Sequence, residues 1–433
     1  MKFNSSAAEE LRPFLLLWST QSLSTLGSSM TSFALVLWSY QVRGSALTTA
    51  LLSVCSYAPY VLVSIFAGAL SDRWNKRITM LVSDSLAALC TLSILVLALT
   101  NRLEIGYLYL LNALSGLMNT VQQPASDVAV SLLTPKRHYQ RASGLRSLSY
   151  SLNSMLAPAL ATALYAAAGL QAVLFFDLAT FLLAFCTLLF RISIPQPPAR
   201  KGTEETLLQS ARSGLHYLLR HRGILDLILF LASINFTASM FNAALPALVL
   251  SRPWGGQKVL GLVQAISGGA MLAGSTAVSL LPAPKSRVRA ICGALLLSMS
   301  TENFLLSLGH SLPVWYIGAA LGWVGVPVMN ANMDALFRSY IPVDIQGRVY
   351  AARNTLQFFT IPLGYFLGGA LVDLFFEPLS DRMGDAMLWS LLFGQGKGSG
   401  TAALFLLLGI LGVATCLIFR RDPHIQLLES SRP

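Results

Sequence analysis

Two long runs without charge, separated by a short and charge-dense turn, restrict this chain to a membrane fold. Residues 47–69 carry no charged side chain, and residues 78–99 carry only Asp84. A helix needs about 20 residues to cross a hydrocarbon layer about 30 Å thick, so each run is long enough to span a membrane. Only 11% of the 433 residues are charged, whereas a soluble domain has about 25%. We therefore expect an all-α membrane protein.

The positive charges lie mostly on one side of this expected membrane. Of the 30 Lys and Arg residues, only six lie on the side opposite the termini: Arg43, Arg102, Arg252, Lys258, Arg382 and Lys397. Cytoplasmic loops carry such an excess of cations, so we expect a multi-pass protein of the cell (plasma) inner membrane with both termini in the cytoplasm. The net charge of +11 then reflects topology, and no nucleic-acid partner is expected.

The apolar stretches predict twelve transmembrane helices. Their ranges are 13–41, 46–70, 78–99, 105–131, 142–168, 170–191, 224–250, 257–281, 288–308, 312–336, 347–373 and 400–420. The polar residues 193–223 predict a cytoplasmic linker with a basic amphipathic helix on the inner leaflet, or a plain linker helix. The expected organisation is an N-terminal six-helix bundle (1–192), this linker, and a C-terminal six-helix bundle (224–433).

Four residues recur in both halves of the chain with identical spacing. Asp127, Pro135, Arg141 and Arg146 correspond, after a constant offset of 207 residues, to Asp334, Pro342, Arg348 and Arg353. Each set joins two predicted helices. The pattern predicts two six-helix pseudo-repeats.

The charge-dense turn also carries a resemblance to a known family. It contains Gly68, Leu70, Asp72, Arg73, Lys76 and Arg77. These residues match the loop G-x-L-A-D-R-x-G-R-K between the second and third helices of the major facilitator superfamily, and the resemblance covers nearly the whole chain. Asn75 replaces the second glycine, which we expect to be a mild change because asparagine tolerates a left-handed turn. Residues 209–221 resemble the drug:proton antiporter branch of macrolide-efflux and siderophore-exporter proteins.

The resemblance implies a twelve-helix major facilitator fold and a secondary active transporter. It would export a hydrophobic or amphipathic small molecule, such as a drug, a macrolide-like compound or a siderophore, by proton antiport with alternating access. An importer with the same fold, and a non-transporting membrane scaffold or receptor, remain alternatives. The sequence shows no nucleophile–base pair and no metal-ligand spacing, so we expect no enzyme, no metal and no cofactor. The expected partners are the small molecule, protons and the lipid bilayer, and the expected state is a monomer.

Polar side chains recur at helical spacing on several predicted helices. Such stripes avoid lipid, so they face either other helices or a water-filled cavity, and we favour the cavity. We expect it to be apolar and aromatic with scattered amides, which suits a hydrophobic or amphipathic substrate. The expected cavity residues are Trp18, Gln21, Thr25, Ser28, Asn112, Asn119, Gln122, Tyr150, Asn235, Asn242, Trp323, Asn354 and Gln357.

Charged residues near the cytoplasmic helix ends are candidates for gating. By analogy with the family, the acid of the fourth helix pairs with a basic residue of the loop, and Asp72 lies near the start of the eleventh helix. We expect these charges to form a latch that holds the cytoplasmic side shut; the alternative is that they only fix topology. The gating residues are Gly68, Asp72, Arg73, Lys76, Arg77, Asp127 and Arg146, with Asp334 and Arg353 as a weaker counterpart.

Proton coupling needs a buried acid inside the spans. Asp84, Asp177 and Glu302 are the candidates. All three lie on helices that are peripheral in the family fold, which counts against each of them. Glu302, beside Asn303, is the first choice, and Asp84 is kept with it. A hydrogen-bonded structural acid is the alternative role.

Overall fold

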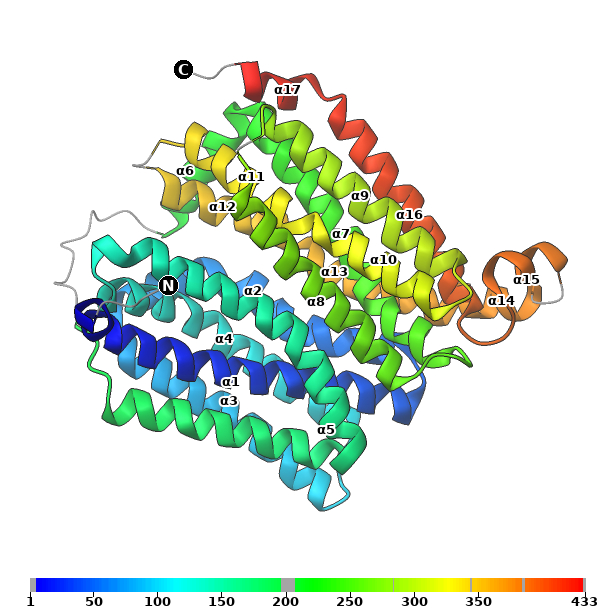
Figure 1. Cartoon of the computed structure of the whole chain (residues 1–433), viewed down its shortest axis with the longest axis horizontal. Coiled ribbons are helices and arrows are strands. Elements are labelled where there is room, and N and C mark those ends of the chain that lie inside the picture. The colour runs from blue at the N-terminus through cyan, green and yellow to red at the C-terminus, as the bar shows by residue number, and fades with distance from the viewer. Residues whose placement is uncertain (1–4, 196–206, 283, 343–344, 384–385, 431–433) are drawn as a thin grey trace. The chain divides into compact units, whose positions relative to one another are not determined.

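The computed structural model describes residues 5–195, 207–282, 284–342, 345–383 and 386–430. Every regular element in these ranges is a helix (Figure 1). The chain forms two compact units. Unit 1 comprises Met1–Trp38 and Cys55–Glu205, and unit 2 comprises Ser39–Val54 and Thr206–Pro433. Residues 39–54, which we assigned to the N-terminal bundle, therefore cluster with unit 2.

Five long helices build unit 1, and two of them also supply most of residues 39–54 of unit 2. They are α1 (Ser5–Arg43), α2 (Ala46–Arg73), α3 (Lys76–Leu99), α4 (Ile105–Leu133) and α5 (Tyr139–Phe190), with a short 3₁₀ turn at Lys136–His138. The α5 helix contains the predicted fifth and sixth helices as two arms. They meet at Gly169, whose φ of +76° only glycine adopts readily. The chain reverses direction at this point (Figure 1).

Unit 2 has more and shorter helices than the sequence predicts. The elements are α6 (Leu207–Arg220), α7 (Arg222–Ser251), α8 (Gln257–Leu280), α9 (Arg287–Leu308), α10 (Leu312–Val324), α11 (Val326–Tyr340), α12 (Gln346–Phe358), α13 (Thr360–Leu371), a π-helical turn η2 (Val372–Phe376), α14 (Glu377–Met383), α15 (Met387–Phe393), α16 (Ser399–Arg420) and α17 (Pro423–Ser430). The predicted helices 312–336 and 347–373 are each divided. Pro327 and Pro362 stand just after the two breaks and lack the N–H group that a continuous helix would use.

Helices at all twelve predicted ranges do not by themselves establish twelve membrane spans. Within the described residues, nine candidate spans are long and apolar enough to cross a membrane, and α1 and α4 are not among them. The α5 helix enters this number as one segment of 52 residues. The polar stripes that the sequence places on α1 and α4 lower their hydropathy. The number twelve therefore stays a prediction.

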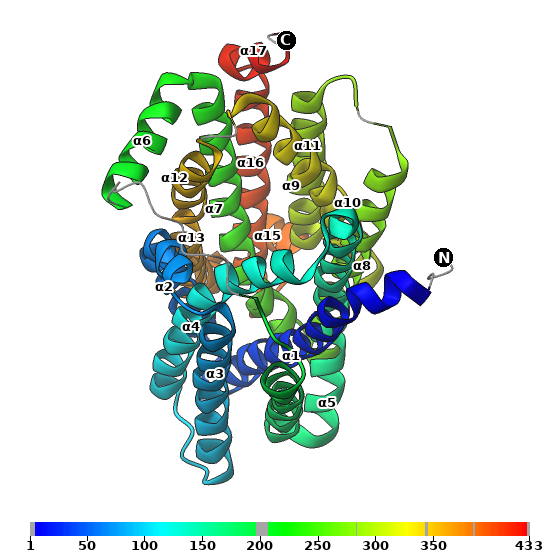
Figure 2. The ribbon, with the colours of Figure 1, turned by 90° about the vertical axis from the view of Figure 1, so that its left-hand side faces the viewer.

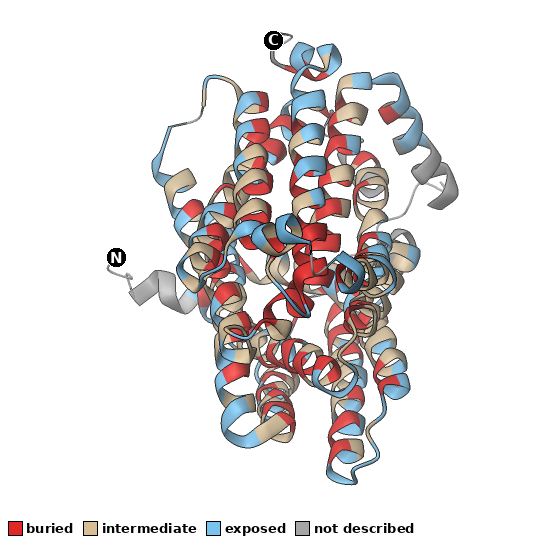
Figure 3. Ribbon diagram, turned by 90° about the vertical axis from the view of Figure 1, so that its right-hand side faces the viewer, coloured by how far each residue is buried: buried red, intermediate tan, exposed pale blue. Residues whose placement is uncertain are grey.

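The outer face of α3 shows how unit 1 meets lipid. Its exposed apolar residues are Ile78, Val82, Leu86, Leu89, Leu92, Val96 and Leu99. They recur every three or four residues, so they form one stripe along the helix. Buried and exposed positions alternate in the same manner along other long helices (Figure 3). An exposed apolar stripe of this length is expected of a face that contacts hydrocarbon.

The core of unit 2 is built around α7. Helices α7, α9 and α16 run side by side in this unit (Figure 2). Two amphipathic helices close the same core: α6 inserts Leu218, which is fully buried, and α17 inserts Ile425 and Leu428. The hydroxyl of Tyr217 on α6 donates to the carbonyl of Tyr340 at 3.1 Å. The predicted linker helix is therefore present, and Leu218 packs against protein, whereas Leu215 and Leu219 of the same helix are exposed.

Two carboxylates cap helices in unit 2. Asp373 accepts hydrogen bonds from the backbone N–H groups of Ala46 and Leu47 at 3.0 and 2.9 Å, at the start of α2. Glu377 accepts from Gly398 N and Thr401 N at 3.0 and 2.8 Å, at the start of α16. A carboxylate is favourable there because the first N–H groups of a helix have no partner within it. The glycine-rich segment 394–400 thus binds a carboxylate of the same chain, because Gly398 N donates to Glu377.

Candidate functional site

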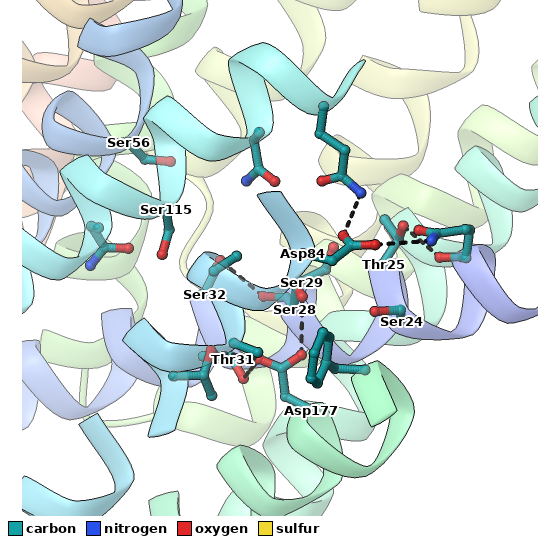
Figure 4. Close-up of a pocket in the computed structure, with 18 of the residues that line it drawn as sticks. Ser24, Thr25, Ser28, Ser29, Thr31, Ser32, Ser56, Asp84, Ser115 and Asp177 are labelled. Carbon is teal, nitrogen blue, oxygen red and sulfur yellow. Dashed lines mark hydrogen bonds between the residues drawn. The ribbon is translucent and has the colours of Figure 1, made fainter. Parts of the chain in front are cut away.

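A cavity of about 480 Å³ lies within unit 1. Helices α1, α3, α4 and α5 enclose it, and α2 contributes Ser56 (Figure 4). Most of its lining side chains are hydroxyls and amides, and Phe181 is the only aromatic residue among the described ones that line it. The cavity is therefore polar, whereas the sequence predicted an apolar and aromatic one.

Asp84 projects into this cavity from α3. Gln21 on α1 donates its amide N–H to Asp84 Oδ2 at 3.1 Å. Gln122 on α4 donates to Asp84 Oδ1. One carboxylate thus connects three helices, and both of its oxygens accept a hydrogen bond from an amide (Figure 4). The interaction explains why the sequence can carry an acid in the middle of an apolar helix.

Asp177 is the second acid in the cavity, and it is almost fully buried, with 3% of its surface exposed. It lies on the second arm of α5. Three hydroxyls donate to its carboxylate: Ser28 to Oδ1 at 3.0 Å, and Thr31 and Thr91 to Oδ2 at 2.9 and 3.2 Å. Asp177 therefore joins α5 to both α1 and α3 (Figure 4).

Gly27 allows this close approach between α1 and α5. A Cβ atom on Gly27 would collide with Thr180 Oγ1 and would lie 3.0 Å from Asp177 Cα. Glycine at position 27 therefore lets α1 and α5 pack closely. Ser28, the next residue along α1, then reaches the carboxylate of Asp177.

The predicted cavity residues fall into three groups. Six of them line the cavity: Gln21, Thr25, Ser28, Asn112, Asn119 and Gln122. Trp18 and Tyr150 do not: the Trp18 indole donates to the carbonyl of Leu145 at 3.1 Å, and Tyr150 is 67% exposed. The other five, Asn235, Asn242, Trp323, Asn354 and Gln357, belong to unit 2. There, Asn235 donates to the backbone carbonyl of Gln357 at 3.2 Å.

An ion pair lies at the rim of the cavity. Arg146 on α5 is paired with Asp127 on α4, and both side chains are nearly half exposed. The corresponding residues of unit 2 are also paired: Arg353 Nη1 lies 3.8 Å from Asp334 Oδ1. Arg353 is more buried than Arg146, since its guanidinium also packs 4.4 Å from the ring centre of Phe337. The two halves thus repeat the same interaction at an offset of 207 residues.

The residues of the charge-dense turn have structural contacts where they are described. Arg77 donates to the carbonyls of Leu188, at 3.1 Å, and Leu189, at the end of α5. Lys76 is buried and donates to the carbonyl of Trp74 at 3.1 Å. The side-chain environments of Gly68, Asp72 and Arg73 lie outside the described part of the structure, so their predicted role in gating stays a prediction.

Asn75 corrects one expectation from the sequence. Its φ of −64° is not left-handed. Instead, its side-chain oxygen accepts from Arg77 N at 3.0 Å and Ile78 N at 3.3 Å, so Asn75 is the N-cap of α3.

Glu302, the first choice for proton coupling, lies in a different environment in unit 2. It is 5% exposed, and the indole of Trp323 donates to its Oε1 at 3.1 Å. A Cβ on Gly322 would lie 2.5 Å from its Oε2, so α10 packs directly against the carboxylate. This geometry favours a structural acid that joins α9 to α10.

Among the described residues, one group of His and Asp side chains has the spacing of metal ligands: Asp226, Asp422 and His424. His424 Nδ1 lies 3.2 Å from Asp226 Oδ2 and 3.6 Å from Asp422 Oδ1. The same Asp422 oxygen accepts from the backbone N–H groups of His424 and Ile425. An ion pair and a helix cap account for all three residues.

Several contributors to the site were not proposed from the sequence, and two of them are polar residues on α3 and α2. Thr91 and Ser56 line the cavity from α3 and α2. Thr91 follows Asp84 by seven residues, which places both on one face of a helix. That spacing was the available signal. Ser56 gives no such signal, because single serines are common within membrane helices.

Comparisons with known proteins agree with this architecture. The sequence profile described as the Major Facilitator Superfamily matches residues 17–364. Macrolide efflux protein A of Streptococcus pyogenes is 20% identical over 364 residues, covering 83% of this chain and 89% of that protein. The multidrug efflux pump Tap of Mycolicibacterium fortuitum is 23% identical over 379 residues, with 83% and 89% coverage.

A solved structure has the same fold. The crystal structure of a mutant of the nucleoside transporter NupG matches with a TM-score of 0.70, at 10% sequence identity. The match covers 94% of this chain and 99% of that one. At this identity the likeness concerns the fold alone.

The Gly27 contact gives a direct test of the packing around the site. We expect Gly27→Ala to lower the stability of the purified protein by about 1–3 kcal/mol, because the added methyl group forces α1 away from the backbone of α5. Thermal unfolding in detergent measures the change. Gly144→Ala is the matched control, since a Cβ at Gly144 meets nothing within 4 Å. Equal melting temperatures for both variants and the parent protein would contradict the close approach.

Proposed function

This chain belongs to the Major Facilitator Superfamily, and on that premise we propose that it exports a hydrophobic or amphipathic small molecule across the cell membrane in exchange for protons. The observation that carries the proposal is the polar cavity in unit 1, built from helices with lipid-facing apolar stripes. Polar groups at membrane depth are expensive unless they line a water-filled path or pair with one another. A carrier has use for such a cavity, whereas a purely structural bundle has none.

The lining favours an amphipathic ligand over a wholly hydrophobic one. Three carboxylates, Asp84, Asp127 and Asp177, face the cavity or its rim, against the single guanidinium of Arg146. Arg146 is already paired with Asp127. The remaining negative charge suits a ligand with a protonated amine, and the hydroxyls and amides suit a ligand with several hydroxyl groups. A drug, a macrolide-like compound or a hydroxylated siderophore fits this description.

The relatives support export as the direction of transport. Two similar proteins are named as efflux proteins, one for macrolides and one for several drugs. The excess of cations on the side of the termini supports an inner-membrane protein with both termini in the cytoplasm. We extend the proposal to a monomer, because the cavity is enclosed by helices of a single chain.

The paired charges support a gating role. Asp127 and Arg146 join α4 to α5, and Asp334 and Arg353 join α11 to α12. Each pair connects two helices across a cytoplasmic loop in the proposed topology. With Asp72, they would hold these helix ends together while the cytoplasmic side is shut and release them when it opens.

Transport in inside-out vesicles tests the function. The probes are a radiolabelled macrolide antibiotic and a hydroxamate siderophore. We expect at least one of them to accumulate when the lumen is made acidic, because luminal protons leave as the compound enters, and an uncoupler should abolish this. Asp84→Asn should reduce uptake about tenfold or more, the effect of losing a hydrogen-bonded charge. Asp381→Asn is the control, because Asp381 is an exposed acid on α14.

Other outcomes of the vesicle assay would contradict export. Accumulation only in right-side-out vesicles would make the protein an importer. If neither probe is transported in either orientation, and neither stabilises the purified protein against heat, a non-transporting scaffold is the better assignment.

The gating role makes a separate prediction. Asp127→Ala should lower stability by less than about 1 kcal/mol, because exposed ion pairs contribute little, yet it should slow transport severalfold. The charge reversal Asp127→Arg with Arg146→Asp should restore much of the rate, since it re-forms the pair. Rates are measured in the same vesicles, with expression and melting temperature as controls. An unchanged rate in Asp127→Ala would leave topology as the only role of these charges.

A further inference from the structure

The environment of Asp177 is different from that of every other acid in the described membrane helices. Its carboxylate is almost fully buried, lines the cavity, and accepts hydrogen bonds from three hydroxyls on two helices. We propose that Asp177 is the proton-binding residue of this carrier, with the hydroxyls of Ser28, Thr31 and Thr91 as its hydrogen-bond partners in both protonation states. The proposal rests on the proton exchange proposed above and names the residue that performs it.

Hydroxyl partners are suited to a carboxyl group that changes its protonation state. A hydroxyl donates one hydrogen bond and accepts others, and its hydrogen turns freely. While Asp177 is ionised, the three hydroxyls donate to it. When Asp177 gains a proton, the new O–H group donates to the oxygen of one hydroxyl, which turns its own hydrogen elsewhere. Only one hydroxyl group has to turn.

The displaced hydroxyl hydrogen has an acceptor within its own helix. In α1, the hydroxyls of Thr25 and Ser32 donate to the carbonyls of Gln21 and Ser28, four residues earlier, at 2.8 and 3.0 Å. Ser28, Thr31 and Thr91 also lie within helices, so each has a carbonyl four residues earlier. Rotation of one of these hydroxyl groups about its Cα–Cβ bond would direct it to that carbonyl, which gives the protonated state of Asp177 an alternative set of hydrogen bonds.

Asp84 lacks this property. Both of its partners are the amide nitrogens of Gln21 and Gln122, which donate and do not accept. A protonated Asp84 would lose one of these hydrogen bonds unless a whole amide group turned over. Two amide donors favour the ionised carboxylate of Asp84, which would bind a cationic group of the ligand.

Among the described residues that line the cavity, no positively charged side chain is paired with Asp177, so its carboxylate is available to bind a proton. Helix α1 contributes only hydroxyls, an amide and an apolar side chain to the described lining. Other helices contribute the titratable or charged side chains that line the cavity besides Asp177. They are Asp84 from α3, Asp127 from α4 and Arg146 from the first arm of α5. Arg146 is paired with Asp127. In the binding step, a hydronium ion in the cavity transfers its proton to a carboxylate oxygen of Asp177, forming an O–H bond and leaving water; release is the reverse.

Infrared difference spectroscopy tests the assignment without any transported compound. The protein is reconstituted in lipid vesicles, and spectra at low and high pH are subtracted to show the C=O stretch of protonated carboxyl groups. We expect Asp177→Asn to remove one component of this band, while Asp84→Asn and Glu302→Gln retain it. Thr31→Val should shift the frequency of that component, because it changes the hydrogen bonding of the carboxyl group; a purely structural role would not produce this shift.

Three results would overturn the proposal. The first is a band that is unchanged in Asp177→Asn but reduced in Asp84→Asn or Glu302→Gln. The second is a frequency that does not change in Thr31→Val. The third is suppression of the component at constant pH when Na⁺ replaces K⁺, which would make Na⁺ the occupant. Failure of export in the vesicle assay leaves the Asp177 component untouched, so the two proposals fail separately.

Discussion

Hydrogen bonds to Asp84 and Asp177 are the interactions on which unit 1 depends. A carboxylate inside a membrane bundle is costly unless polar groups surround it. Here Asp84 joins α3 to α1 and α4, and Asp177 joins α5 to α1 and α3. The same contacts that make the acids tolerable therefore fix four helices around one cavity. The cavity and the packing of these helices therefore depend on the same hydrogen bonds.

Carboxylates have a second, separate use in unit 2. Asp373 and Glu377 follow one another closely in the chain and cap the starts of α2 and α16. Both satisfy backbone N–H groups that would otherwise lack partners. Glu302 serves packing through Trp323. Asp373, Glu377 and Glu302 thus hold helices in place, whereas Asp84 and Asp177 line a cavity.

Apolar runs, and the charged residues and glycines that interrupt them, predict much of this fold. The turn before α3, the two arms of α5 and the repeat that pairs Asp127 with Arg146 all follow from spacing. The short helices α14, α15 and α17 do not, because tertiary contacts such as the burial of Ile425 stabilise them. Six of the thirteen cavity residues were found from helical periodicity. All three candidate acids were expected on peripheral helices, and Glu302 was preferred for its position beside Asn303. Only the fold shows that Asp177 reaches across to α1.

The central claim is that water reaches the polar face of α1 and α4 inside unit 1. Thiol labelling in a variant without native cysteines tests it most directly. A membrane-impermeant, charged thiol reagent should react with Ser28→Cys and Asn119→Cys, which line the cavity, and should spare Leu89→Cys on the lipid-facing stripe of α3. Protection of both cavity positions under all conditions of pH and ligand, with the protein folded, would contradict the account.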